Sequence, residues 1–132
     1  MTAIERIAQA IAGLERIRVV REAPQRIVNA SDLPLAYITV DSIETRRISF
    51  DTSIDRTSAR LTVIVAPVVM AEARTVQRVR EITAIVKEAL DGVPDIDTYL
   101  SYSVRHVTVE IAGIQYLAAV FDITAVEEEV IA

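Results

Sequence analysis

The sequence has no cysteine, a single histidine and only three glycines among its 132 residues. The absence of cysteine excludes disulfides and thiolate metal sites. His106 cannot form a multi-histidine metal site alone, and no serine–histidine–aspartate signature surrounds it. The glycines at 13, 92 and 113 are scattered, so there is no glycine-rich phosphate loop. We therefore expect no catalytic residue, no cofactor, no bound metal and no enzymatic activity.

Long apolar runs and an excess of positive charge are missing as well. The longest apolar run, Leu61–Ala71, contains Thr62 and Pro67 and is shorter than the ~20 residues of a membrane span. The net charge of −5 disfavours non-specific binding to nucleic acid. Lys87 is the only lysine, and the other cations are arginines, which favour interfaces with carboxylates. A GC-rich coding bias explains the arginines equally well.

The remaining polar residues give only weak evidence for a metal site or a small-molecule site. Asp91, Asp95 and Asp97 lie close in sequence, but they lack the glycine and the final glutamate of a calcium-binding EF-hand loop, so a solvated loop is favoured. A small-molecule site would have to use Tyr102, His106 and Asp122. We expect His106 to face solvent or a subunit contact, because strand alternation places it opposite Val107.

The N-terminal third predicts a helix and a connection. Apolar residues recur at helical spacing over residues 4–17, and Thr2 with Glu5 forms a capping-box pattern. Residues 18–22 suit a short extended piece, and Pro24 begins a connection that runs through residues 23–34.

The middle of the chain predicts strands, a hairpin and a long helix. Leu35–Val40 reads as a strand, and 41–45 as a polar link. A hairpin, 46–54 with 59–65, would turn at Asp55–Ser58 and project from the domain with Ile54 near its tip. Glu72–Leu90 is an amphipathic helix that Gly92 would end in a left-handed conformation.

The last third predicts a second hairpin, 99–111 with 115–126, around a turn at residues 112–114. In its last strand both faces are apolar, so the face with Tyr116 and Val120 should meet the first helix or another subunit. Residues 127–132 should form a frayed acidic tail. The predicted core comprises Val63, Val65, Val79, Ile82, Val86, Val109, Phe121 and Ile123.

These elements define one α+β domain over residues 1–132. We expect a mainly antiparallel sheet of about five strands, a long helix packed on one face and an N-terminal amphipathic helix.

This layout resembles the tail terminator and tail-completion proteins of long-tailed bacteriophages. The resemblance rests on Leu33–Ile38 entering a strand, on Leu61–Pro67 leading to the long helix, and on Ile111–Tyr116 around a glycine turn. It implies a virion protein of the tail–neck region, assembled in the host cytoplasm. Such a protein forms a homohexameric ring that caps the tail tube and docks head or neck connector proteins. Double-stranded DNA passes through the lumen without specific binding, and no membrane is involved.

Two alternatives remain open: a head–tail connector one layer higher, and a dimeric α+β domain that binds a small molecule. For a ring, the candidate interface residues are the arginines and Ile54 of the first hairpin, the apolar face of the last strand and the acidic tail. The tail glutamates could instead be merely solvated, and Arg46 with Arg47 could merely protect an edge strand. The candidates are Arg46, Arg47, Ile54, Arg56, Tyr116, Val120, Glu127, Glu128 and Glu129.

Overall fold

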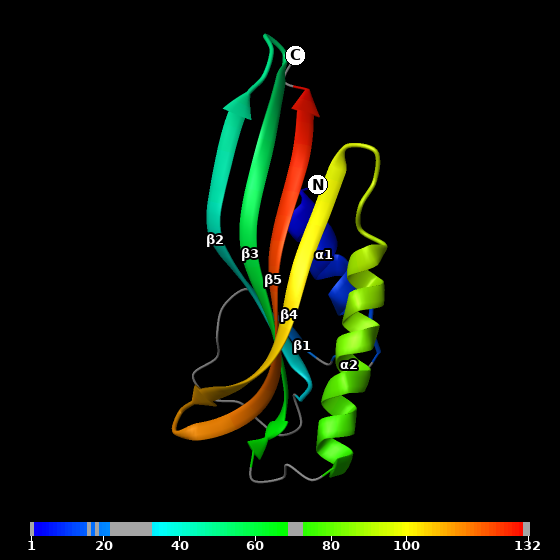
Figure 1. Ribbon diagram of the computed structural model, residues 1–132, viewed down its shortest axis with the longest axis vertical. Coiled ribbons are helices and arrows are strands. Elements are labelled where there is room, and N and C mark those ends of the chain that lie inside the picture. Colours follow the sequence, from blue (N-terminus) through cyan, green and yellow to red (C-terminus); the bar gives the residue numbers. More distant parts are fainter. Residues whose placement is uncertain (1, 16, 18, 22–32, 69–72, 131–132) are drawn as a thin grey trace.

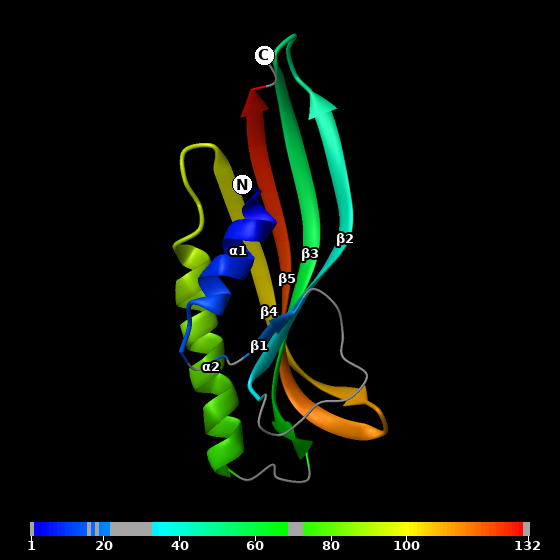
Figure 2. The same ribbon diagram turned by 180° about the vertical axis from the view of Figure 1, so that it is seen from behind.

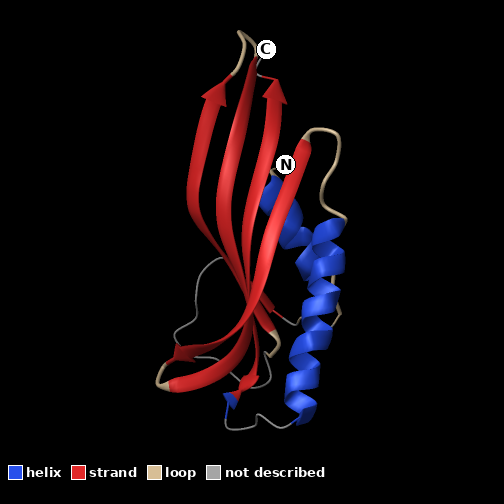
Figure 3. Ribbon diagram, viewed as in Figure 1, coloured by secondary structure: helices blue, strands red, loops and turns tan. Residues whose placement is uncertain are grey.

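A computed structural model describes residues 2–15, 17, 19–21, 33–68 and 73–130, and it has an α+β fold with a largely antiparallel sheet (Figure 1). The order is β1-β2-β3-β5-β4; β2 to β5 are antiparallel to their neighbours, and the short β1 is parallel to β2. Both helices lie on one side of the sheet, which we call the helix face; the other side is the outer face (Figures 2 and 3). The elements are α1 (Ala3–Ala12), β1 (Val19–Arg21), β2 (Leu35–Arg47), β3 (Thr52–Pro67), α2 (Ala73–Asp91), β4 (Thr98–Ile111) and β5 (Ile114–Val130).

The boundaries of the first hairpin differ from those predicted. The segments 35–40, 41–45 and 46–47 form one continuous strand, β2, and the predicted turn at Asp55–Ser58 lies inside β3. The chain instead turns at residues 48–51. The polar residues 55–58 do not form a turn, because each of them pairs with β2 on one side and with β5 on the other. Most of the predicted connection 23–34 falls outside the described residues.

The first helix is shorter than predicted but is capped as expected. The hydroxyl of Thr2 accepts a hydrogen bond from the backbone N–H of Glu5 at 3.2 Å. The helix ends at Ala12, since Gly13 follows as its C-cap. Ile17 is still buried, although it lies beyond the helix.

The main core lies between the two helices and the helix face of the sheet. Phe121, Ile82 and Val86 are each at most 1% exposed, and Ile7 and Ile11 of α1 join the same cluster. The central strand β3 is buried on both faces over residues 61–66, which are apolar except for Thr62. Every predicted core residue is buried except Val109, which is partly buried in a second cluster.

That second cluster lies on the outer face, and α1 does not cover it. Tyr116 and Ala118 pack there with residues of β2, β3 and β4, whereas α1 joins α2 on the helix face. Of the two predicted covers for the Tyr116–Val120 side, the first helix is therefore wrong, whereas a contact with another subunit stays a prediction. The buried members of the cluster are Leu33, Leu35, Tyr37, Ile64, Ile111, Tyr116 and Ala118.

Three local predictions concern the second half of the chain. The β4–β5 turn lies where expected, and Ala112 and Gly113 have φ of 52° and 82°, a backbone that glycine adopts readily. Gly92 does not adopt a left-handed conformation; its N–H instead bonds to the carbonyl of Ala89. Residues 127–130 are not frayed, because they form the end of β5 and pair with Thr52–Asp55 of β3.

Candidate assembly surface on the β2–β3 arm

The upper part of the first hairpin projects beyond both helices (Figure 1). We call residues 39–58 the arm; it comprises the end of β2, the turn and the start of β3. Residues 39–47 of β2 are all exposed, whereas β3 is flanked by β2 on one side and by β5 on the other. Because β1 pairs only with residues 35–37, this part of β2 is a free sheet edge within the described residues. A free edge offers backbone groups to another chain.

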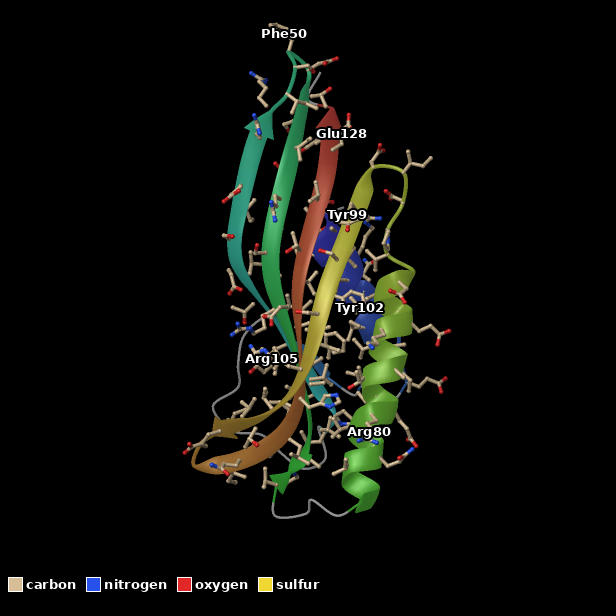
Figure 4. All side chains as sticks on the ribbon, viewed as in Figure 1. Phe50, Arg80, Tyr99, Tyr102, Arg105 and Glu128 are labelled. Carbon is tan, nitrogen blue, oxygen red and sulfur yellow. The ribbon has the colours of Figure 1, made fainter. Side chains whose placement is uncertain are left out.

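The tip of the arm carries an exposed aromatic ring. The N–H groups of Ile48 and Ser49 bond to the carbonyl of Thr52, and the carboxylate of Asp51 accepts from the hydroxyls of Ser49 and Thr52. Phe50 is 97% exposed at the apex of the molecule (Figure 4). Exposed large apolar residues also follow the arm below it: Val40, Ile43 and Ile48. A concentration of exposed apolar side chains is typical of a contact surface.

The outer face of the arm has a hollow of about 520 Å³ whose lining includes three arginines, and we call it the basic hollow. Register places Arg46 and Arg56 on this face, whereas Arg47 lies opposite Ser53 on the helix face. In the strand register Arg56 lies opposite Glu44, and Arg46 lies opposite Ile54. No ion pair joins Arg46, Arg47 or Arg56 to any residue that the structure describes. The lining residues are Glu44, Arg46, Arg47, Ile48, Ile54, Arg56 and Val126.

The helix face of the same strands has a hollow of about 360 Å³ lined by five acidic residues, which we call the acidic hollow. Glu128 lies opposite Ile54 in the register, so its side chain belongs to the outer face. Asp55 lies opposite Glu127 in the register and accepts a hydrogen bond from Thr45 at 2.7 Å. Glu127 accepts the backbone N–H of Ala3 at 2.7 Å, next to the positive end of the α1 dipole. The lining residues are Thr2, Glu5, Asp55, Glu127, Glu128 and Glu129.

One arginine of α1 fastens the helix beside the acidic hollow. Arg6 donates to the carbonyl of Val93 at 3.0 Å and to the carboxylate of Asp95 at 2.8 Å. It also donates to the hydroxyl of Thr98 and lies 4.0 Å from Glu127. The backbone N–H of Asp97 lowers the pKa of Asp95, and the Arg6 charge lowers it further.

Lower on the outer face, the charges are paired within the chain. Asp122 accepts from Arg60 at 3.1 Å and from Arg105 at 3.2 Å. The hydrogen bond from Arg60, together with that from Arg105, holds the pKa of the Asp122 carboxyl below its ordinary value. This group differs from the basic hollow, where Glu44 lies opposite Arg56 but no ion pair joins them.

The structure brings most of the predicted interface residues to the arm. Arg46, Arg47 and Arg56 are exposed, Ile54 is half-buried, and Glu127–Glu129 form the paired end of β5. Two of the candidate interface residues, Tyr116 and Val120, are only 3% and 4% exposed and therefore do not lie on the surface of the single chain. The sequence reasoning missed Phe50 and the acids Glu5 and Asp55. Correct placement of the turn would have revealed Phe50.

The polar residues proposed for a small-molecule site do not converge. Tyr102 and His106 lie on the helix face, whereas Asp122 lies on the outer face with its two arginines. The Tyr102 hydroxyl donates to Asp91, and its pKa is raised by burial and by that carboxylate. His106 is exposed, but it also contacts α2. The Thr83 hydroxyl donates to the carbonyl of Val79, so it accepts from Nε2–H of His106 at 3.0 Å.

The described residues contain neither a metal-binding cluster nor a helix that could span a membrane. No three or more acidic or histidine side chains there are arranged to hold a metal ion, and this includes the Asp91–Asp97 loop. Neither of the two helices combines the length and the apolar character needed to cross a bilayer.

The chain matches no protein-family model, and no curated protein sequence matches it.

Proposed function

We propose that this chain is a structural ring subunit of a phage tail, of the tail-terminator type. The observation that carries the proposal is the arm, a set of paired strands that extends past the body of the domain and ends in an exposed phenylalanine. A domain that acted alone would gain nothing from exposing Phe50, Ile43 and a free strand edge. An arm of this form suits contact with neighbouring copies or with a tube beneath them.

The charge distribution supports the same proposal. A subunit with a net charge of −5 suits a lumen through which DNA must pass without adhering. Ring closure to six copies, docking on the tail tube and attachment of a head or neck protein follow from the resemblance stated above. In this proposal the protein works by shape and contact, and it needs no catalytic residue or cofactor.

The proposal is tested by the oligomeric state and by capping of tail tubes. Native mass spectrometry of the purified chain at micromolar concentration should show a closed ring of six copies. Added to polymerising tail-tube protein, the ring should stop elongation and appear at one tube end in electron micrographs. A monomer that leaves tube growth unchanged would refute the proposal. A ring found only at the head side of the neck would instead assign it to the connector layer.

The tip of the arm gives a sharper version of the test. Phe50→Ser should leave the free energy of unfolding unchanged within about 0.5 kcal/mol, because the Phe50 side chain is almost fully exposed. It should nevertheless weaken ring formation or tube capping. The matched control is Ile114→Ser, since Ile114 is also exposed but lies at the β4–β5 turn, away from the arm.

A further inference from the structure

The edge of β2 in the arm is a regular strand from Ser42 to Arg47. Each of these residues pairs one to one with a residue of β3, and the β-bulge lies below them, between Val40 and Ser42. The segment contains no proline and no glycine. Below the bulge the same edge is occupied, because β1 pairs in parallel with residues 35–37 of β2. Above the bulge the edge keeps its strand geometry, and no described residue pairs with it.

The hydrogen bond at the turn decides which residues direct their backbone groups to the free side. The N–H of Ile48 donates to the carbonyl of Thr52 at 3.1 Å, so these two residues form a hydrogen-bonded pair. Hydrogen-bonded and non-hydrogen-bonded pairs alternate along antiparallel strands. Counting back along the register, Ile43, Thr45 and Arg47 fall in non-hydrogen-bonded pairs with β3. Their N–H and C=O groups therefore point away from β3, to the free side.

A hydrogen bond on the far side of the arm agrees with this count. The same alternation puts Arg46 and Ile54 in a hydrogen-bonded pair, so the backbone groups of Ile54 face β2 and not β5. Glu128 lies opposite Ile54 on β5 and must then direct its N–H away from β3. It does so, since that N–H donates to the carbonyl of Asp97 at 3.0 Å. The free edge thus offers three N–H and three C=O groups at strand spacing.

Backbone groups at this spacing are matched by another extended polypeptide, which can add to the edge as a new strand. The side chains indicate its pattern. Ile43 is 64% exposed and Thr45 follows on the same face, so β-branched residues suit the positions opposite them. Arg46 and Arg47 end the edge on opposite faces, and neither forms an ion pair with a described residue. Two consecutive carboxylates on the added strand would pair with both arginines.

The chain itself does not supply such a strand among the described residues. Consecutive acidic residues occur in the sequence only at 127–129. That segment is already paired with β3 on one side, and on its other side the N–H of Glu128 is bonded to Asp97. The pattern that the edge requires therefore favours a different polypeptide over a second copy.

We infer that the free edge of the arm binds an extended segment of a different polypeptide as an additional antiparallel strand. The segment has β-branched residues opposite Ile43 and Thr45, and two consecutive acidic residues opposite Arg46 and Arg47. This partner goes beyond the proposed ring, because the binding depends on the edge of the arm alone.

A synthetic peptide with blocked ends tests the inference. It reads threonine, glutamate, glutamate, valine, lysine, valine, threonine. In antiparallel alignment its glutamates lie opposite Arg47 and Arg46, and its lysine lies opposite Glu44. Titrated into isotope-labelled protein, it should shift the amide NMR signals of residues 42–47, and at saturation it should slow amide exchange at Thr45 about tenfold or more. Unchanged signals at millimolar peptide would overturn the inference.

Two N-methylated peptides of identical composition separate backbone pairing from side-chain attraction. Methylation of both valines removes the N–H groups that face β2 opposite Ile43 and Thr45, and it should weaken binding about tenfold or more. Methylation of the lysine and of the glutamate beside the first valine removes N–H groups that face away from β2. This second change should alter the affinity by less than about twofold. Equal losses from the two peptides would contradict strand addition.

A pair of protein variants tests the same hydrogen bonds from the other side. Thr45→Pro removes one outward N–H and should abolish peptide binding, whereas the fold should persist, because an edge strand tolerates proline where the missing N–H would face solvent. Thr45→Val is the matched control: it keeps the N–H, and like the proline variant it loses the hydroxyl bond to Asp55. Thermal unfolding checks that both variants fold. Equal peptide binding by the two variants would overturn the inference.

Native mass spectrometry of the same variants keeps this inference apart from the proposed function. A ring formed by Thr45→Pro as by the wild type supports a partner outside the ring. Loss of the ring in Thr45→Pro but not in Thr45→Val would show that the edge joins copies of this chain, and it would overturn the inference of a different partner. Peptide binding by a chain that forms no ring would refute the ring and leave the inference standing.

Discussion

The two ends of the β2–β3 hairpin differ, although the same two strands form both. At the base, residues 35–38 of β2 and 61–66 of β3 are buried on both faces. In the arm, residues 39–47 of β2 are all exposed, and in β3 only Ser53 and Thr57 are buried. The base contacts both helices and two strands, whereas the arm pairs with β5 and meets only the start of α1, near Asp55, among the described residues (Figure 1).

The difference shows that the base of the hairpin stabilises the fold, whereas the arm presents side chains that can contact another molecule. Burial of apolar surface stabilises the base, because each fully buried leucine or isoleucine contributes roughly 1.5–3 kcal/mol. The arm depends on backbone pairing with β5 and buries little. Its side chains can therefore carry charge and exposed apolar groups at small cost to the fold.

The largest expected difference in unfolding free energy is between two substitutions in the hairpin, one at its base and one in the arm. Leu61→Ala at the base should lower the free energy of unfolding by about 2–5 kcal/mol, because Leu61 is 0% exposed and its removal leaves a cavity. Ile43→Ala in the arm should change it by less than about 0.5 kcal/mol, because Ile43 is 64% exposed. Urea unfolding of both variants measures the difference. Equal losses would mean that the arm is packed like the base.

A smaller effect is expected at the arginine that fastens α1. Arg6→Ala removes hydrogen bonds to Val93, Asp95 and Thr98, and it should cost about 1–3 kcal/mol. Amide exchange should accelerate in α1 and near Val93, but not in the turn of the arm. Arg6→Lys is the matched control: it keeps the charge but cannot reproduce the forked geometry, so a partial loss is expected. Acceleration in the arm as well would show that α1 supports it.

The smallest effect concerns the paired charges below the arm. The pKa of Asp122 is lowered, so its stabilisation is present above the ordinary aspartate pKa of about 3.9 and is lost as pH falls through the lower folded value. Asp122→Asn should therefore cost under about 1 kcal/mol at pH 7, because the pairs are exposed and screened. Urea titrations should show the difference from wild type disappearing below pH 4. A difference that persists there would point to packing instead of charge.

Some elements could be predicted because their signals are local. The 3.6-residue spacing of Val79, Ile82 and Val86 marks one side of α2, and the structure buries all three. The glycine at 113 marks the β4–β5 turn. The turn at residues 48–51 was missed because it contains no glycine or proline, while the polar run at Asp55–Ser58 imitates a loop.

The candidate surface was predictable only in part. Arg46 and Arg56 were found from their charge, but their alignment on one face follows from a β-bulge between Val40 and Ser42 that shifts the register. The acidic hollow joins Glu5 of α1 to Asp55 and Glu129, which lie far apart in the sequence. Tyr116 and Val120 were assigned to an interface because no covering element for that face was evident.

The sequence by itself determined the class of fold, the buried side of α2 and the absence of cysteine chemistry. These depend on periodicity and composition, which neighbouring residues carry. Only the tertiary structure decided that residues 52–58 form a strand of the arm between β2 and β5, and that Phe50 is at its apex. Each of those depends on which strands pair and in what register, and that choice is made by contacts between distant parts of the chain.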